Sequence, residues 1–222
     1  MGEAEALSVS TSELQSIYLS KISEALLRLT ACETFLDSYK NSGSPFYFEA
    51  AVLQIRKSME CIAFAAVATN KKKYAELRQK NDKSTDYTRD YNAKKILQLL
   101  SNINKDFYPI PLSKPIFISP GNWHFEVREY GALTKNRFES FYDRLGKFLH
   151  ADNPWGVDKN VKNLVKDMPE IISSIRALLS FHVALIRTSE FLGAWVVESP
   201  LNGEPPRILT AEADGEFIVS QR

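Results

Sequence analysis

The stretch PFYFEAAVLQIRKSMECIAFAAVATN, residues 45–70, predicts one long helix that decides the fold. Its apolar side chains recur every three or four residues, which is the period of one helix face. Pro45 suits the first helical position, because its missing N–H would have no intrahelical partner there. Alanine fills many other positions, so the helix is slim and neighbouring helices can pack closely around it. The expected core face comprises Val52, Ile55, Met59, Ile62, Ala66 and Val67.

Helical patterns on both sides of this segment predict a bundle of about five helices. Before it, Ser10 and Glu13 have the spacing of a capping box, and the helix that begins there is expected to end within NSGSP, residues 41–45. The basic residues 71–95 are expected to cover the end of the central helix, a polar loop and the start of the next helix. The later apolar patterns predict helices around 96–103, 134–150 and 161–186, the last kinked or split at Pro169.

Two parts of the chain predict a minor β element. Four prolines between residues 104 and 120 exclude a helix, and IFIS and WHFEV flank a Pro-Gly-Asn turn, which predicts a hairpin near 115–127. After residue 192, β-rich runs alternate with turn residues, which predicts an antiparallel meander. The expected fold is therefore mainly α, with a small antiparallel β element. We expect a disordered segment 1–9, a helical bundle domain 10–192 that includes the hairpin, and a meander 193–222 packed on the bundle.

Composition excludes several classes of function. Lys and Arg number 28 against 27 Asp and Glu, so the whole chain is not a strongly basic nucleic-acid clamp. Cys32 and Cys61 are the only cysteines and the three histidines are dispersed, so we predict no metal site and no cofactor. The N-terminus lacks the positive charge of a signal peptide, and charges interrupt the most apolar stretch. These features predict a cytoplasmic protein with no membrane partner.

Residues 71–95 form the most basic block of the chain, with nine Lys or Arg against four Asp or Glu. Lys71, Lys72 and Lys73 could contact RNA phosphates and give a salt-dependent affinity. The alternative is a solvated helix end, which is the commoner role of such a run. Three tyrosines interleave with this block, Tyr74, Tyr87 and Tyr91. They could stack on RNA bases or pack within the protein.

The segment DRLGKFLH, residues 143–150, carries the one arrangement with catalytic chemistry. On a continuous helix at about 100° per residue, Arg144 and His150 would lie about 120° apart, so they can share a site only if the helix ends first. The Asn153-Pro154 turn makes such an end plausible. A histidine can transfer a proton at a ribose 2′-hydroxyl, and an arginine can stabilise the charge on the phosphoryl oxygens.

Four further residues could support this pair. Asp143 shares a helix face with His150 and could orient its imidazole, while the turn at Asn153 could form an anion-binding concavity. Arg56 and Glu60 lie four residues apart on the central helix. We expect them to form a structural ion pair, with contact to the motif as the alternative. The motif itself also admits a structural interpretation, as a solvated helix face with a histidine at the C-terminal end of the helix dipole.

An Arg-x(5)-His spacing late in a helical bundle resembles the HEPN family, whose motif is Arg-x(4–6)-His. The segment RKSMECIAF, residues 56–64, is also similar to the second helix of such proteins. Over residues 10–192 the resemblance implies a bundle of four to five helices and a metal-independent endoribonuclease of toxin or antiviral-defence type. It implies Arg144 as the phosphoryl-stabilising group and His150 as general acid or base. It also implies RNA as substrate, a homodimer in which both motifs meet, and an antitoxin or defence protein as partner.

Two other functions remain open from the sequence. Leu145 and Asp152 stand where active family members often carry a polar residue and some carry a tyrosine, which favours a non-catalytic helical module for RNA or protein binding and dimerisation. Gly146 would then let a partner helix approach closely. An enzyme that uses Cys32 and Cys61 is the third hypothesis, although neither has a histidine nearby in the sequence.

Overall fold

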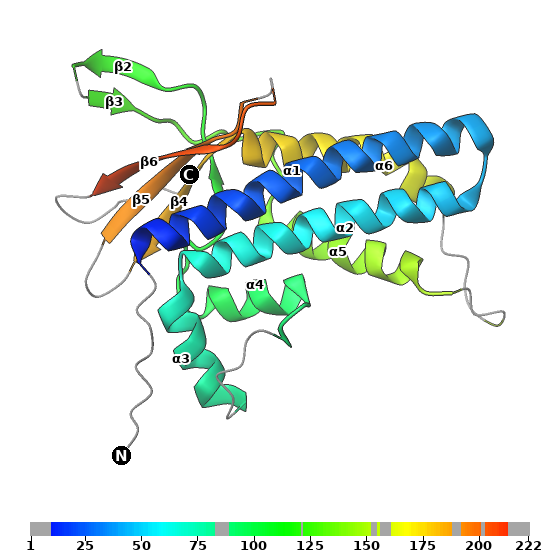
Figure 1. Cartoon of the computed structure of the whole chain (residues 1–222), viewed down its shortest axis with the longest axis horizontal. Helices are drawn as coiled ribbons and strands as arrows, with labels where there is room; N and C mark the ends of the chain where they lie inside the picture. Colours follow the sequence, from blue (N-terminus) through cyan, green and yellow to red (C-terminus); the bar gives the residue numbers. More distant parts are fainter. Residues whose placement is uncertain are drawn as a thin grey trace.

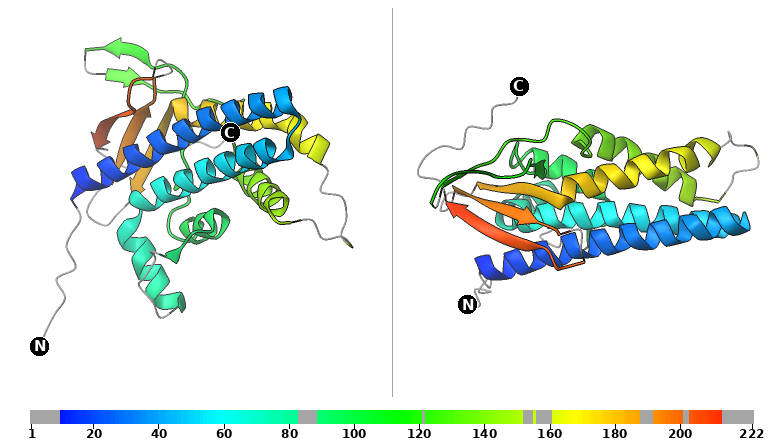
Figure 2. Two further views of the ribbon diagram at one scale, coloured as in Figure 1. Left: turned by 45° about the vertical axis from the view of Figure 1, so that its right-hand side comes forward. Right: turned by 90° about the horizontal axis from the view of Figure 1, so that it is seen from above.

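The structure, a computed structural model, describes residues 10–82, 89–120, 122–151, 155, 161–187, 192–200 and 203–212. Helices α1 (Thr11–Ser42) and α2 (Pro45–Ala68) form a long antiparallel hairpin. Helices α5 (Lys135–Leu149) and α6 (Val161–Ser180) pack on one side of it, and the strands gather at the end where α1 begins (Figures 1 and 2). The predicted fold class, mainly α with a small antiparallel β element, is confirmed.

The ends of the first two helices follow the predicted signals. The Ser10 side chain accepts a hydrogen bond from the backbone N–H of Glu13 at 3.2 Å, so Ser10 is the N-cap of α1. Gly43 ends α1 with φ 69°, a conformation that favours glycine, and its N–H donates to the Tyr39 carbonyl oxygen at 2.8 Å. Pro45 then opens α2, as predicted.

Helix α2 lies at the centre of the bundle, as its alanine-rich sequence predicts. Its slim surface lets the Ser58 hydroxyl donate to the Ala25 carbonyl oxygen of α1 at 2.9 Å. Its buried residues are Phe48, Ala51, Val52, Ile55, Ser58, Met59, Cys61, Ile62, Ala63, Ala65, Ala66 and Ala68.

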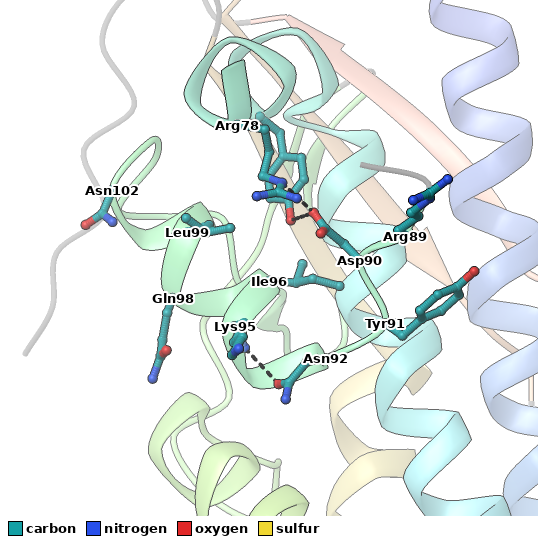
Figure 3. A pocket seen from close by; sticks show the side chains of 11 residues that line it. Arg78, Arg89, Asp90, Tyr91, Asn92, Lys95, Ile96, Gln98, Leu99 and Asn102 are labelled. Carbon is teal, nitrogen blue, oxygen red and sulfur yellow. Dashed lines mark hydrogen bonds and ion pairs between the residues drawn. The ribbon is translucent and has the colours of Figure 1, made fainter. Parts of the chain in front are cut away.

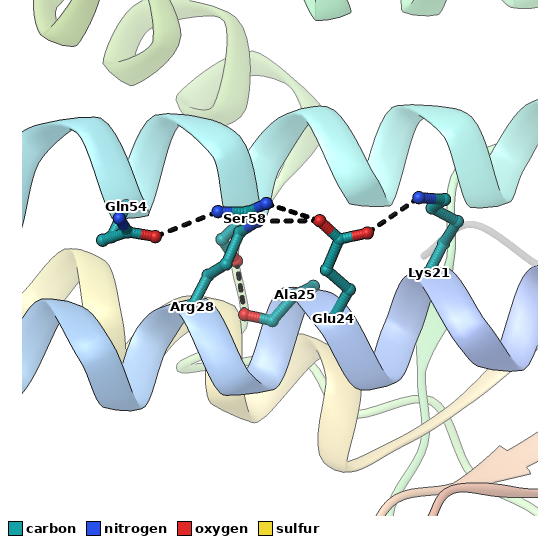
Figure 4. A network of polar contacts seen from close by, with 6 residues as sticks. All are labelled: Lys21, Glu24, Ala25, Arg28, Gln54 and Ser58. Carbon is teal, nitrogen blue, oxygen red and sulfur yellow. Dashed lines mark hydrogen bonds and ion pairs between the residues drawn. The ribbon is translucent and has the colours of Figure 1, made fainter.

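A row of polar side chains follows the outer seam between α1 and α2 (Figure 4). Arg28 donates to the Glu24 carboxylate at 2.6 Å and to the Gln54 side-chain oxygen at 3.0 Å. Lys21 donates to the other oxygen of Glu24 at 2.7 Å. Hydrogen bonds from Lys21 and Arg28 lower the pKa of Glu24 to about 2, so Glu24 is ionised between these two cations at neutral pH.

A four-stranded antiparallel sheet closes one end of the bundle, in the order β1 (Ile110–Pro111), β4 (Phe181–Arg187), β5 (Leu192–Glu198) and β6 (Arg207–Glu212). The expectation that the last helix continues to Ile186 is wrong, because α6 ends at Ser180 and the chain enters β4 at once. The meander therefore begins at residue 181 instead of 193. Residues 213–222, where a further strand is expected, and residues 1–9, expected to be disordered, lie outside the described residues.

The predicted hairpin near 115–127 is confirmed as β2 (Ile116–Ser119) and β3 (Asn122–His124). It forms a separate two-stranded sheet that projects from the body of the molecule (Figure 1). The preceding segment joins the main sheet instead, since Ile110 pairs with Val183. Helix α6 continues through Pro169, so of the two expected alternatives, a kink or a split at this proline, the split is wrong.

The basic block departs from its expected structure. It forms a separate helix, α3 (Lys71–Asp82), which the sequence pattern did not predict, before the chain reaches α4 (Ala93–Ser101). Both helices lie below the C-terminal end of α2 in Figure 1. Within the described part of the chain, no helix is long and apolar enough to span a bilayer.

The bundle and the sheet share one aromatic core. The Tyr18 ring of α1 lies edge-on to the Trp195 ring of β5, with 5.7 Å between their centroids. His182 of β4 lies 3.3 Å through Nδ1 from the Leu179 carbonyl oxygen, which places the proton on Nδ1. The Tyr18 hydroxyl then donates to Nε2 at 2.8 Å. His182 is therefore a hydrogen-bonded core histidine on strand β4.

Candidate functional site

The C-terminal end of α5 carries the predicted catalytic pair. Thr134 caps the helix by accepting a hydrogen bond from the Arg137 N–H at 3.4 Å. The helix then buries Phe138, Tyr142 and Leu145 against the bundle. It ends at Leu149, and His150 has extended backbone angles of φ −77° and ψ 150°. The side chain of His150 is exposed. The prediction that the helix ends before the motif histidine is confirmed.

Arg144 is positioned by a residue of the neighbouring helix α6. Its Nη1 atom donates to the Asp167 carboxylate at 2.5 Å, and the two side chains are 35% and 38% exposed. A guanidinium has five N–H donors, so this ion pair leaves donors that can serve an anionic ligand. Sequence reasoning did not identify Asp167 as a partner of Arg144, because the rotation of α6 that brings the two residues together is a property of the packed bundle.

Asp143 forms an ion pair with a residue of the neighbouring helix α4. Its carboxylate accepts a hydrogen bond from Lys94 of α4 at 2.5 Å, and this contact raises the pKa of Lys94. Asp143 therefore connects α5 to α4, and its orienting role at His150 stays a prediction. Asn153, the other residue expected beside the motif, lies outside the described residues.

Arg56, Glu60 and Tyr142 form a polar cluster that joins α2 to α5. Arg56 Nη1 donates to the Tyr142 carbonyl oxygen at 2.9 Å, and its guanidinium carbon lies 3.8 Å from the centroid of the Tyr142 ring. The Tyr142 hydroxyl donates to Glu60 at 3.0 Å and accepts from the Ala93 N–H at 3.3 Å. Arg56 and Glu60 also pair with each other at 3.5 Å. Burial raises the pKa of Tyr142 to about 12. The ion pair expected between Arg56 and Glu60 is present, and both residues also contact Tyr142 on the helix that carries Arg144.

Gly146 makes room for this cluster. A Cβ atom at position 146 would lie 2.5 Å from Arg56 Nη1, which is too close for any real contact. The space beside Gly146 is therefore occupied by the Arg56 side chain of the same molecule. The close approach that Gly146 allows is made here by Arg56 of α2, and the use of this surface by a second copy stays a prediction.

The three lysines expected to bind RNA lie far from the catalytic pair. Lys71, Lys72 and Lys73 begin α3, beyond the C-terminal end of α2. His150 lies toward the other end of α2. Phe148, two residues before it, contacts Phe48 near the start of α2, with 5.1 Å between the ring centroids. At 1.5 Å per residue, the helix between these two ends is about 30 Å long. The structure therefore does not bring the predicted RNA-binding and catalytic residues together (Figure 1).

Both cysteines are poor nucleophiles. Burial raises the pKa of Cys32 to about 12 and that of Cys61 to about 11, because the apolar surroundings disfavour a thiolate. The hypothesis of a thiol-dependent enzyme therefore has no support from the geometry. In the parts of the chain that the structure describes, no three His, Cys, Asp or Glu side chains are grouped to hold a metal ion.

Comparison with known proteins adds no family to this description. No protein-family model matches the chain, and no curated protein or solved structure is significantly similar to it.

Proposed function

We propose that this chain is a metal-independent endoribonuclease of HEPN type, with Arg144 and His150 as its catalytic residues. The observation that carries the proposal is the end of α5 at Leu149, after which the exposed His150 follows extended backbone angles. Arg144 lies less than two helical turns earlier, and its half-buried guanidinium is held against α6 by Asp167. RNA is the substrate in this proposal, and an antitoxin or defence protein is a candidate partner.

The proposed reaction is an internal transesterification. The His150 imidazole takes the proton of a ribose 2′-hydroxyl, and the 2′-oxygen attacks the adjacent phosphorus. The bond from phosphorus to the 5′-oxygen breaks, which leaves a 2′,3′-cyclic phosphate on one product. The leaving 5′-oxygen takes a proton from an imidazolium, supplied by a second copy where two motifs meet in a homodimer. Arg144 donates hydrogen bonds to the phosphoryl oxygens as their charge grows.

Removal of the imidazole tests this assignment. Cleavage of a labelled RNA in EDTA is expected from the wild type, and His150→Ala is expected to lower the rate roughly 100- to 10,000-fold, because it removes the proton-transfer group. Arg144→Ala is expected to lower the rate as well. Lys147→Ala is the matched control, because Lys147 is an exposed cation in the last turn of the same helix. Unchanged cleavage by His150→Ala would contradict the assignment of His150 as a catalytic residue.

A non-catalytic binding module is the second candidate. The ion pair between Arg144 and Asp167 favours it, because this guanidinium already has a carboxylate partner. This alternative predicts that the wild type binds RNA or a second copy and leaves the RNA intact. Binding would then be equal in the wild type and His150→Ala, whereas the ribonuclease proposal requires the two proteins to differ in cleavage.

A further inference from the structure

The last turns of α5 before His150 are in contact with three neighbouring helices. Asp143 forms an ion pair with Lys94 of α4, and Arg144 forms one with Asp167 of α6. These four side chains are between 33% and 47% exposed, and ion pairs of such exposure are weak because water screens them. They therefore fix the direction of the helix only loosely. A more buried contact with the same turns comes from α2.

This contact is made by Arg56, whose side chain is 22% exposed. Its Nη1 atom donates to the Tyr142 carbonyl oxygen at 2.9 Å, and its guanidinium carbon lies 3.8 Å from the centroid of the Tyr142 ring. A carbonyl oxygen has two lone pairs, so this one can also accept the helical bond from the Gly146 N–H. A Cβ atom at Gly146 would lie 2.5 Å from Nη1, so the glycine is what gives the guanidinium its place. Arg56 thus holds the backbone of the turn that contains Arg144.

The same tyrosine connects this turn to the start of α4. The Tyr142 hydroxyl accepts from the Ala93 N–H at 3.3 Å and donates to Glu60 at 3.0 Å, and Glu60 pairs with Arg56 at 3.5 Å. Asn92 caps α4, because its side-chain oxygen accepts a backbone N–H three residues later at 3.1 Å, beside the cavity between α3 and α4 (Figure 3). The contacts of Arg56 therefore join α2, α4 and α5 at one point.

We infer that Arg56 is a positioning residue for RNA cleavage, which holds the last turns of α5 so that Arg144 and His150 meet the same phosphodiester. The inference rests on the proposed function. The Arg56 guanidinium lies over the Tyr142 ring and donates to a backbone carbonyl oxygen, so it acts through the helix and not through RNA. Its loss is therefore expected to lower kcat and to leave KM unchanged, whereas loss of a phosphate-binding arginine would raise KM.

The kinetics of RNA cleavage in EDTA test this inference. Arg56→Ala is expected to lower kcat roughly 10- to 100-fold, because a misplacement of about 1 Å has an effect of this size. Arg28→Ala is the matched control, with kcat expected within about twofold of the wild type. Arg28 is 26% exposed, pairs with Glu24 on its own helix and donates to Gln54 of the neighbouring helix, but it lies on the seam between α1 and α2 (Figure 4). All proteins are assayed at a temperature at which circular dichroism shows them folded.

A second variant displaces the guanidinium without removing its charge. Gly146→Ala is expected to lower kcat in the wild-type background and to have no further effect in Arg56→Ala, because both changes break one contact. Unchanged kcat in Arg56→Ala, an equal loss in Arg28→Ala, or independent effects of Arg56→Ala and Gly146→Ala would overturn the inference and leave the proposed function intact. Absence of cleavage by the wild type would overturn both.

Discussion

His182 shows at the scale of one residue how burial changes the chemistry of a side chain. The imidazole is fully buried between the bundle and the sheet, and loss of hydration lowers its pKa to about 4 from its ordinary value of 6.5. The folded protein therefore holds this histidine neutral, while the unfolded chain protonates it below pH 6.5. The contribution of neutral His182 to the free energy of unfolding is fully present above pH 6.5 and is lost as the pH falls toward 4.

We expect this single proton to lower the free energy of unfolding by about 3 kcal/mol between pH 7.5 and pH 4. Urea unfolding across this range measures the slope. In His182→Phe the position no longer titrates, so the free energy of unfolding is expected to change less steeply with pH. The variant is also expected to be less stable than the wild type at pH 7.5, because the Tyr18 hydroxyl loses its acceptor. An identical slope in both proteins would contradict the assignment of the proton to His182.

Gly146 is the residue at which two elements meet most tightly, and it connects the residue scale to the helix scale. The guanidinium of Arg56 fills the place where a side chain would start. In the wild-type background, Gly146→Ala is expected to lower stability by about 1 kcal/mol, because Arg56 must leave the Tyr142 ring and carbonyl oxygen. In an Arg56→Ala background the same change is expected to be neutral or stabilising, because alanine is the better helix former.

A double-mutant cycle by chemical denaturation measures this coupling between α2 and α5. Arg137→Ala, which removes a different cation from the surface of α5, is the control background, and Gly146→Ala is expected to keep its full cost there. Additive effects of Gly146→Ala and Arg56→Ala would show that the contact does not hold the two helices together.

At the scale of the elements, local signals made the first two helices predictable. The capping box at Ser10, the glycine at position 43 and the proline at position 45 act over a few residues, so the sequence alone locates the helix ends. The segment 181–187 behaves differently. Ala184, Leu185 and Ile186 are buried and fall on both faces of the strand, and such an apolar run fits a helix as well as a strand. Tertiary packing against β5 decides the outcome.

At the scale of the whole molecule, part of the candidate site could be predicted and part could not. The helix end at His150 depends on nearby residues, so the sequence anticipated it. The partners Asp167 and Lys94 depend on how α6 and α4 are rotated against α5, and no local pattern reports that rotation. The lysine run at 71–73 is separated from His150 by the length of α2, which a motif search does not take into account.

The central claim is that His150 activates a ribose 2′-hydroxyl, and the chemistry of the product ends tests it most directly. The wild type is incubated in EDTA with an RNA oligonucleotide and with the same sequence carrying 2′-O-methyl groups, and the products are analysed by mass spectrometry. We expect 2′,3′-cyclic phosphate and 5′-hydroxyl ends from the RNA, and no cleavage of the methylated strand, because it has no 2′-proton to remove. Products with 5′-phosphate ends, or cleavage of the methylated strand, would contradict the proposed mechanism.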